Sequence, residues 1–384
     1  MLVTQIYELM NNVTSEILGK NDIIAEDLSN VVDVGVEIFN ASSVDNYVRS
    51  LVDHIGKVIF VNRPYQGNAP SVVMDGWEFG AVCEKIQGEL PEATVNESWE
   101  LEDGASYDNQ IFYKPVVSAK FFSKRVTFEV DRSFTEMQVK SSFSNAQQLN
   151  AFISMIYNDV EKSMTIKVDE LVMRTINNFI AETIYQEYGA NSLSESSHVK
   201  AVNLLYLYNE TYSKSLAAAD CFTDPDFIRF SAYIIGRYKY RLQKISTLFN
   251  IGAKPRFTRP DDLHFIMHAD FATGADIFLQ SDTFHNEYTK LDGAEVVPYW
   301  QGSGDDYAFT QNTALNVTNT EGHTINTSGI VAVMFDRDAL GVTNYNRRVT
   351  TAYNAKGEFI NNYFKMDSGY FNDFNENFIV FFVA

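Results

Sequence analysis

Residues 145–188 read NAQQLNAFISMIYNDVEKSMTIKVDELVMRTINNFIAETIYQEY, a stretch without proline or glycine. Apolar residues recur in it at steps of three and four, which places one continuous stripe on one face of an α-helix. Ser144 and Gln147 form a capping box that predicts the helix start, and Gly189 stands where a C′ glycine would end it. The stripe comprises Leu149, Phe152, Ile153, Ile156, Val160, Met164, Val168, Leu171, Val172, Ile176, Phe179, Ile180, Ile184 and Tyr188.

The predicted helix is unusually long. Roughly 44 residues at ~1.5 Å each make a rod of about 66 Å, several times the usual helix length. A rod of this length does not fit inside one compact domain. It could be a coiled coil, a strut across a large flat subunit, or two helices broken near residues 162–165. A strict heptad does not persist past Val160, which favours the strut.

Length and composition narrow the class of protein. The chain of 384 residues, 45% of them hydrophobic, suffices for two or three domains with a substantial core. A formal charge of -20 argues against direct groove binding to nucleic acid, although it suits a surface that stays near nucleic acid without adhering. Cys83 and Cys221 are the only cysteines, so we expect no disulfide framework and no multi-cysteine zinc site. Neither a signal peptide nor a membrane-spanning stretch is indicated.

The segment before the long helix is rich in chain breakers. Residues 4–18 and 43–56 predict short amphipathic helices. Prolines and glycines then exclude long helices over residues 64–134 and leave β-rich pieces at 71–74, 94–99, 116–122 and 126–132. A long β excursion just before a strut is hard to bury within its own subunit. We therefore interpret it as an extended arm that packs on a neighbour.

The segment after the long helix predicts a mixed α/β region. Asp224 followed by Pro225 predicts the start of a helix that runs to residue 249. Residues 199–208 fit a strand or a helix, 263–268 a buried strand, and 269–274 a turn. Residues 302–328 predict a loop or twisted hairpin, and 329–335, 347–353 and 378–383 predict further strands.

His264, His268 and Asp270 have the spacing H-x3-H-x-D. Residues four apart on a strand point to the same side, which is compatible with a metal pair. The intervening Phe-Ile-Met is typical of a core, however, and the sequence indicates no third strong ligand. We therefore favour core histidines. Asp305 and Asp306 follow a glycine-rich turn but match neither a calcium loop nor a phosphate-binding fingerprint, which favours a surface turn.

The paired carboxylates Asp261–Asp262 and Glu100–Glu102 are the residue types that a glycosidase uses. With 50 acidic residues in the chain, such pairs arise by chance. No nucleophile elbow and no phosphate-binding loop are present, and Cys83 is interpreted as a small buried hydrophobe. We therefore predict a protein that is not an enzyme, and we assign no catalytic residue, cofactor or metal ligand.

Two groups of side chains in the β excursion are candidates for contacts. The aromatic group either anchors a partner or closes a small local core, and the sequence leaves both alternatives open. It consists of Trp77, Phe79, Trp99, Phe112 and Tyr113. The basic group either pairs with acids of a neighbour or forms a solvated strand face, and we favour solvation. It consists of Lys120, Lys124, Arg125 and Arg132.

The order of segments resembles the major capsid protein of tailed bacteriophages, whose fold was first described for the Hong Kong 97 phage. Residues 331–382 (VAVMFDRDALGVTNYNRRVTTAYNAKGEFINNYFKMDSGYFNDFNENFIVFF) resemble the terminal segment of phage head proteins, with an Asp-x-x-Ala-type turn after a strand. Residues 263–278 (LHFIMHADFATGADIF) resemble the axial-domain strand and the turn that follows it. Some members of that family carry a covalent cross-link. Lys85 lies in the excursion, but no flanking pattern identifies a partner for it.

The resemblance implies an α+β fold in four parts. These are an N-terminal arm with short helices (1–63), an E-loop (64–134), a peripheral domain with the spine helix (135–198 and 329–384) and an axial domain (199–328). It implies that identical subunits assemble as pentamers and hexamers into an icosahedral shell around double-stranded DNA, with non-specific proximity to that DNA.

It further implies a portal, location in the virion and assembly in the host bacterial cytoplasm, without a membrane. Because the N-terminal arm (1–63) begins at Met1, we expect a separate scaffolding protein or none. The competing hypotheses are an encapsulin-type nanocompartment, a tail-tube protein and an acidic glycosidase-like enzyme.

Overall fold

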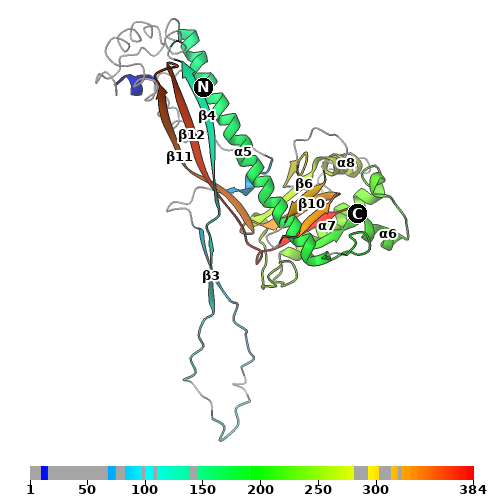
Figure 1. The fold of residues 1–384 in the computed structure, drawn as a ribbon. Coiled ribbons are helices and arrows are strands. Elements are labelled where there is room, and N and C mark those ends of the chain that lie inside the picture. Colours follow the sequence, from blue (N-terminus) through cyan, green and yellow to red (C-terminus); the bar gives the residue numbers. More distant parts are fainter. Residues whose placement is uncertain are drawn as a thin grey trace.

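The computed structural model describes residues 10–15, 68–74, 83–96, 100–106, 110–135, 137, 146–189, 191–280, 293–301, 313–318 and 322–384. These residues form an elongated body in which one long helix joins two sheets, and a long loop leads away from it (Figure 1). Residues 10–15 are helical, as predicted for the middle of 4–18. The predicted helix at 43–56 lies outside the described part of the chain, and so do Ser144 and the side chain of Gln147.

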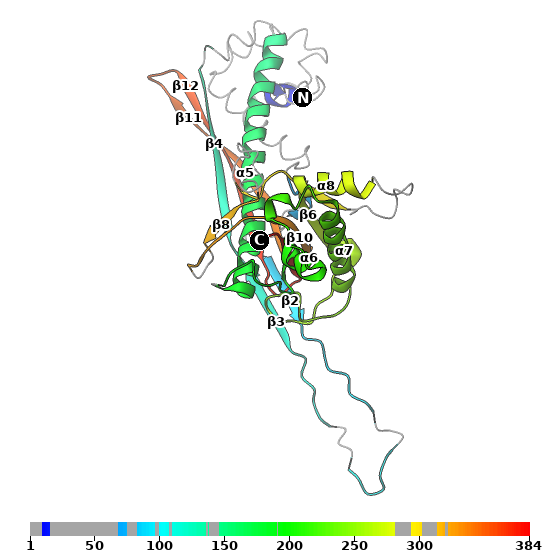
Figure 2. The same cartoon turned by 90° about the vertical axis from the view of Figure 1, so that its right-hand side faces the viewer.

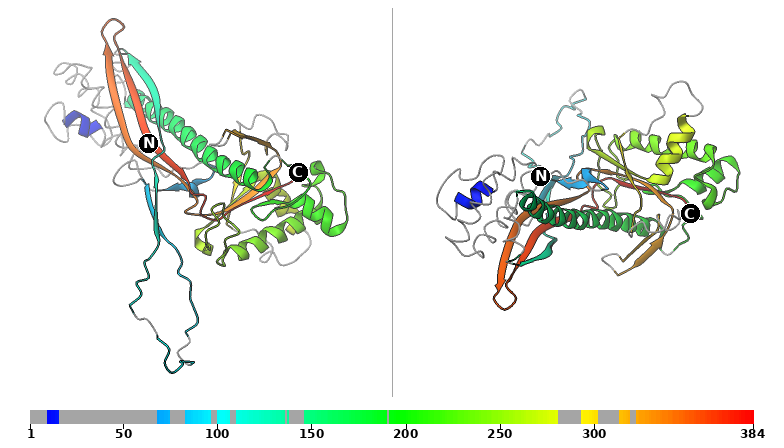
Figure 3. Two further views of the ribbon diagram at one scale, coloured as in Figure 1. Left: turned by 60° about the horizontal axis from the view of Figure 1, so that its bottom comes forward. Right: turned by 90° about the horizontal axis from the view of Figure 1, so that it is seen from above.

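Helix α5, Ala146–Tyr188, is a single helix of 43 residues without the break considered near residues 162–165. It runs beside one sheet and ends against the other, which confirms the strut (Figures 1 and 3). Gly189 follows with φ 57° and donates its N–H to the carbonyl of Tyr185 at 2.8 Å, as expected of a C′ glycine. The stripe is buried at Val160, Met164, Val168, Leu171, Val172, Ile176, Phe179, Ile180, Ile184 and Tyr188.

The first sheet has four strands in the order β1-β11-β12-β4. They are β1 (Val73–Met74), β4 (Arg125–Thr135), β11 (Leu340–Asn354) and β12 (Phe359–Asn372). β12 pairs antiparallel with both β11 and β4, whereas β1 pairs parallel with β11. A 3-10 turn at Pro70–Val72 precedes β1. The sheet therefore brings together segments that lie more than two hundred residues apart in sequence.

The second sheet has five strands in the order β5-β13-β10-β6-β7. They are β5 (Ala201–Asn203), β6 (Leu263–His268), β7 (Ala294–Val297), β10 (Ile330–Asp336) and β13 (Phe378–Phe382). Every residue of the central strands β10 and β13 is buried, so both faces of the sheet are covered. A separate hairpin of β8 (Leu315–Thr318) and β9 (Thr324–Thr327) confirms the hairpin alternative for this region.

Three helices cover the face of the second sheet that lies opposite α5 (Figure 2). They are α6 (Leu204–Tyr212), α7 (Pro225–Leu242) and α8 (Ala269–Gln280). The side chain of Asp224 accepts hydrogen bonds from the N–H groups of Asp226 and Phe227, which confirms the predicted N-cap. Residues 199–208 contain β5 and the start of α6, so each alternative is correct for part of that range. Further 3-10 turns lie at Ala218–Asp220 and Pro260–Asp262.

Some predicted elements are wrong. Residues 269–274 begin α8 rather than form a turn. Gly274 does not break the chain there but allows close packing of the helix, since a Cβ at this position would lie 3.0 Å from Ile228 Cδ1. α7 ends at Leu242 rather than at residue 249. Residues 94–96 have no strand, and β12 was not predicted. In β12 the buried Asn362 interrupts the alternation of apolar residues that would have indicated a strand.

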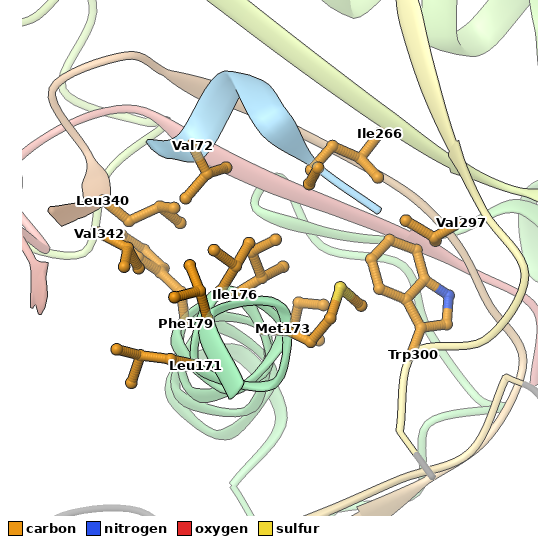
Figure 4. Close-up of a cluster of buried hydrophobic side chains, with 14 of the residues drawn as sticks. Val72, Leu171, Met173, Ile176, Phe179, Ile266, Val297, Trp300, Leu340 and Val342 are labelled. Carbon is orange, nitrogen blue, oxygen red and sulfur yellow. The ribbon is translucent and has the colours of Figure 1, made fainter. Parts of the chain in front are cut away.

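The core around α5 joins both sheets (Figure 4). Side chains from α5, among them Met173, Ile176 and Phe179, lie with residues from the first sheet and with Trp300. The indole N–H of Trp300 donates to the carbonyl of Ile330 at 2.9 Å, and Asn177 donates to the carbonyl of Trp300 at 2.6 Å. No helix in the described part of the chain is long and apolar enough to cross a membrane.

Truncation at Phe179 tests the role of this core. The Phe179 ring is fully buried and stacks on Phe378 with ring centroids 4.0 Å apart. We expect Phe179→Ala to lower the free energy of unfolding by about 3–5 kcal/mol, because it removes a ring shared by helix and sheet. Ile166, on the same helix, is 57% exposed, and Ile166→Ala should stay within about 0.5 kcal/mol of wild type. Equal losses in urea denaturation of both variants would contradict the described core.

Candidate assembly arm and its anchor

Strands β2 (Cys83–Gly88) and β3 (Val117–Phe122) form an antiparallel hairpin, in which Cys83 pairs with Phe122 and Gly88 with Val117. Between them, the described parts of residues 89–116 contain neither helix nor strand, and they lead far from the body (Figures 1 and 2). We call residues 83–122 the arm and residues 89–116 its tip loop. β3 was predicted at 116–122, whereas β2 was not predicted.

The arm exposes large apolar side chains. Phe112 and Tyr113 are each 81% exposed and Val95 is 92% exposed. The others of this kind are Ile86, Leu90, Leu101, Ile111, Val116, Val117 and Phe121. Soluble monomers rarely leave so many apolar residues together in water, and such surfaces mark sites of protein contact. In the described part of the subunit, these side chains are not covered.

The root of the arm is held by ion pairs to the turn between β12 and β13. Lys85 Nζ lies 2.9 Å from Asp373 Oδ2 and 2.7 Å from Glu376 Oε1. Lys120 Nζ, on the opposite strand of the hairpin, lies 2.7 Å from Asp373 Oδ1. The side chain of Asp373 is fully buried, so its charge is compensated by these two lysines rather than by water.

A second set of contacts closes around Glu376. Its Oε1 accepts hydrogen bonds from Gln87 at 2.8 Å and from Arg256 Nε at 3.2 Å. Arg256 Nη2 in turn donates to Gln87 Oε1 at 2.6 Å. On the apolar side of the root, the ring of Phe122 lies 5.0 Å from that of Phe371 in β12. Both strands of the hairpin are thus fixed to the body where they leave it.

The pKa shifts agree with this geometry. Burial alone would raise the pKa of Asp373, but Lys120 and Lys85 outweigh it and hold that pKa below its usual value of 3.8. Burial would lower the pKa of Lys85, yet Glu376 and Asp373 raise it above its usual value of 10.5. Both groups therefore stay charged over a wide range of pH. Burial also raises the pKa of the Cys83 thiol, which is half-buried rather than fully buried as interpreted from sequence.

Of the histidines singled out in the sequence, His268 has hydrogen-bond partners, whereas the buried Nε2 of His264 has none among the described residues. His268 is fully buried, its Nε2 lies 3.1 Å from the carbonyl of Pro298, and its Nδ1 accepts from the N–H of Asp270. The ring of His264 lies against Phe335 at 5.4 Å. Burial lowers the pKa of both imidazoles. Among the described residues, no group of three or more His, Cys, Asp or Glu is arranged to hold a metal ion.

The remaining candidates fall in several places. Asp262 pairs with Arg259 at 2.6 Å, and Glu100 and Glu102 lie exposed on the tip loop. The interpretation of the basic group as a solvated face is wrong for Lys120, which binds Asp373. Lys124, Arg125 and Arg132 are exposed, as that interpretation expects, and Arg132 makes an exposed pair with Asp159 of α5 at 3.2 Å. Phe112 and Tyr113 close no local core, since both are exposed. Trp77, Phe79, Trp99, Asp305 and Asp306 lie outside the described residues.

A family model described as Phi29-like phage major capsid protein matches residues 10–382. The chain belongs to this capsid protein family. The chain is similar in sequence to the major capsid protein of Bacillus phage GA-1. The two are 22% identical over 369 aligned residues, and the alignment covers 94% of this chain. The chain spans 66% of the length of that relative.

A solved capsid structure shares the fold. The capsid structure of Staphylococcus phage Andhra matches with a TM-score of 0.51 at 9% identity, covering 84% of this chain and 86% of that one. A chain in the structure of the head fiber and inner core protein of bacteriophage P68 matches with a TM-score of 0.49 at 11% identity, over 84% and 86% of the two chains. The likeness to the Andhra capsid confirms the predicted α+β capsid protein fold.

Substitution of the buried carboxylate tests the anchor. We expect Asp373→Asn to lower the opening free energy of the β2–β3 hairpin by about 2 kcal/mol, because two lysines lose a buried charged acceptor. Hydrogen exchange of residues 83–88 and 117–122 measures this. The control is Glu89→Gln, which removes an exposed pair with Lys254 at 3.0 Å and should cost less than about 0.5 kcal/mol. Unchanged protection in Asp373→Asn would show that the ion pairs do not hold the root.

The anchor should also respond to acid. A depressed pKa means that the contribution of Asp373 is complete above its usual value of 3.8 and is lost as the pH falls through the lower folded value. We expect hairpin protection, corrected for intrinsic exchange, to be constant from neutral pH down to about pH 4 and to fall below it. In Asp373→Asn this fall should be absent from the hairpin. The same acid profile in wild type and variant would exclude Asp373 as its cause.

Proposed function

We propose that the chain is the repeating subunit of an icosahedral phage head shell, in which identical copies assemble around double-stranded DNA. The observation that carries this proposal is the arm, which is held by ion pairs at its root and exposes apolar side chains that the described part of its own subunit does not cover. Such a segment gains stability by lying on another copy. Membership in a capsid protein family supports the same role.

The finer features of the shell belong to this proposal. Pentamers and hexamers of the subunit would form the closed shell, and a portal and a separate scaffolding protein would complete its assembly in the cytoplasm of the host bacterium. Heterologous contacts between identical subunits close into rings, which suits an arm that reaches from one copy to the next. The mature protein would reside in the virion. Its role would be mechanical, without a catalytic step, and the packaged DNA would be a neighbour without sequence-specific contacts.

The division into four parts remains a proposal too, with residues 1–63 as N-terminal arm, 64–134 as E-loop, 135–198 and 329–384 as peripheral domain, and 199–328 as axial domain. Strands β10 and β13 come from the range assigned to the peripheral domain, yet they pair with β5 and β6 from the axial range. The two domains therefore share the second sheet, and α5 supports both.

Charge at the tip of the arm tests assembly directly. We expect Phe112→Asp together with Tyr113→Asp to abolish shells in negative-stain electron microscopy, because two apolar contact residues become charged and cannot be desolvated against a neighbour. Circular dichroism and the unfolding midpoint should stay at wild-type values, since both side chains are 81% exposed in the subunit.

The matched control is Phe112→Leu with Tyr113→Phe, which keeps both positions apolar and should still give shells. Shells of normal yield from the charged variant would overturn the role of the arm. Particles that enclose protein cargo rather than DNA in the producing cell would favour an encapsulin-type compartment instead.

A further inference from the structure

Residues 227–260 are unusual in a chain with a formal charge of -20, because they contain eight basic residues and no acidic one. The segment includes most of α7 and the loop that follows it. α7 lies on the side of the second sheet opposite α5, towards the outside of the body (Figure 2). Five of the eight basic residues lie in α7 or directly after it, namely Arg229, Arg237, Lys239, Arg241 and Lys244.

The exposed side of α7 carries arginines and tyrosines at helical spacing. Positions three and four apart share a face of a helix. We call this surface the α7 face: Arg229, Tyr233, Arg237, Tyr240, Arg241 and, just after the helix, Lys244. Tyr233 is 63% and Tyr240 72% exposed, and next to them in the chain Ile245 and Leu248 are exposed as well. Tyrosine and arginine are the residues that protein interfaces favour at their centres.

Several cations of the α7 face have no acidic partner. Among the described residues, no ion pair joins Arg237, Arg241 or Lys244 to a carboxylate, and the Nε of Arg237 is buried without a hydrogen-bond partner. The Arg237 and Arg241 guanidinium groups instead lie over the rings of Tyr233 and Tyr238, at 5.8 and 5.3 Å from the ring centroids. By contrast, Arg256 and Arg259, further along the segment, are paired with Glu376 and Asp262.

The tip loop has the complementary composition. Its residues, 89–116, contain seven acidic residues and a single basic one, Lys114. Exposed acids such as Glu92, Glu100 and Asp103 alternate there with exposed apolar residues such as Leu101 and Phe112. The two segments already meet once within the subunit, where Glu89 pairs with Lys254 at 3.0 Å. The rest of the tip loop leads away from its own body and from its own α7 (Figure 1).

A recess beside the α7 face fits an apolar anchor. A cavity of about 380 Å³ is lined by four aromatic rings, those of Tyr208, Tyr212, Phe230 and Tyr233, together with the charged groups of Lys214, Asp226 and Arg229. Aromatic side chains in such pockets dominate many interfaces. The backbone of duplex DNA could satisfy the cations, but it offers nothing for this recess or for Ile245 and Leu248. The surface therefore favours an acidic, apolar protein segment.

We propose that the α7 face and its adjoining recess bind the tip loop of a second copy of this chain. The inference rests on the proposed shell function and names the surface that receives the arm. Opposite charges would steer the loop and fix its orientation, while an apolar side chain such as Phe112 or Leu101 enters the recess.

A labelled peptide of residues 89–113 tests this on the full-length protein by fluorescence anisotropy. We expect saturable binding that weakens with added salt, and a loss of affinity of about ten-fold or more in Arg237→Glu with Arg241→Glu. The control with the same change of net charge is Lys167→Glu with Lys356→Glu, two exposed positions elsewhere, which should bind as wild type does. A peptide with Glu92→Lys, Glu100→Lys and Asp103→Lys should regain binding to the Arg237→Glu, Arg241→Glu protein.

Three results would overturn the proposal: no binding to wild type, equal loss in the control, or no recovery with the reversed peptide. Binding of a DNA duplex of about 25 base pairs, lost in the same variant while the peptide fails to bind, would assign the face to nucleic acid instead. Shell formation is scored separately. Shells without peptide binding contradict only this docking surface, and peptide binding without shells contradicts only the proposed function.

Discussion

Burial of the α5 stripe against both sheets holds the subunit together. Phe179 stacks on Phe378 of the second sheet and contacts Phe374 edge-on at 4.8 Å. Asn372, at the end of β12, donates to the carbonyl of Thr175 at 3.2 Å. The helix thus fixes both ends of the turn between β12 and β13. That turn carries Asp373 and Glu376, so the position of α5 determines where the arm leaves the body.

This arrangement divides the subunit into parts with different sources of stability. The core depends on apolar burial, which α5 shares between both sheets. The root of the arm depends on a few charges held in a poorly solvated place, where a pair is strong only while both partners remain. The tip loop has neither apolar burial nor buried ion pairs among its described residues, since its apolar side chains face water in the isolated subunit. Its ordered conformation in an assembly must therefore come from contact with another molecule.

Much of the fold could be predicted because its signals are local. The stripe of α5, the Asp224–Pro225 cap and the apolar runs of β10 (residues 330–335) and β13 each follow from neighbouring residues. β12 could not be predicted from periodicity, because Asn362 lies on its buried face. The start of α8 resembles a turn in the sequence, because Gly274 has the character of a chain breaker, whereas in the structure this glycine allows close packing against Ile228.

The contacts that hold the root of the arm could not be predicted from the sequence, for a different reason. Lys85 and Asp373 are almost three hundred residues apart, and nothing local in either segment indicates the other. The arm itself could be predicted, because a β-rich segment directly before a long helix is hard to bury within its own subunit. Its acidic and apolar character could be read from the chain, whereas the basic surface of α7 became apparent only once the structure placed its side chains on one face.

We expect the tip loop to become ordered only by contact with another copy. Amide hydrogen exchange of residues 89–116, compared between the isolated subunit and assembled particles, tests it most directly. We expect exchange near the unprotected rate in the isolated subunit, with the root hairpin protected, and strong protection of the loop in particles. Protection of the loop in the isolated subunit, or none in particles, would contradict it.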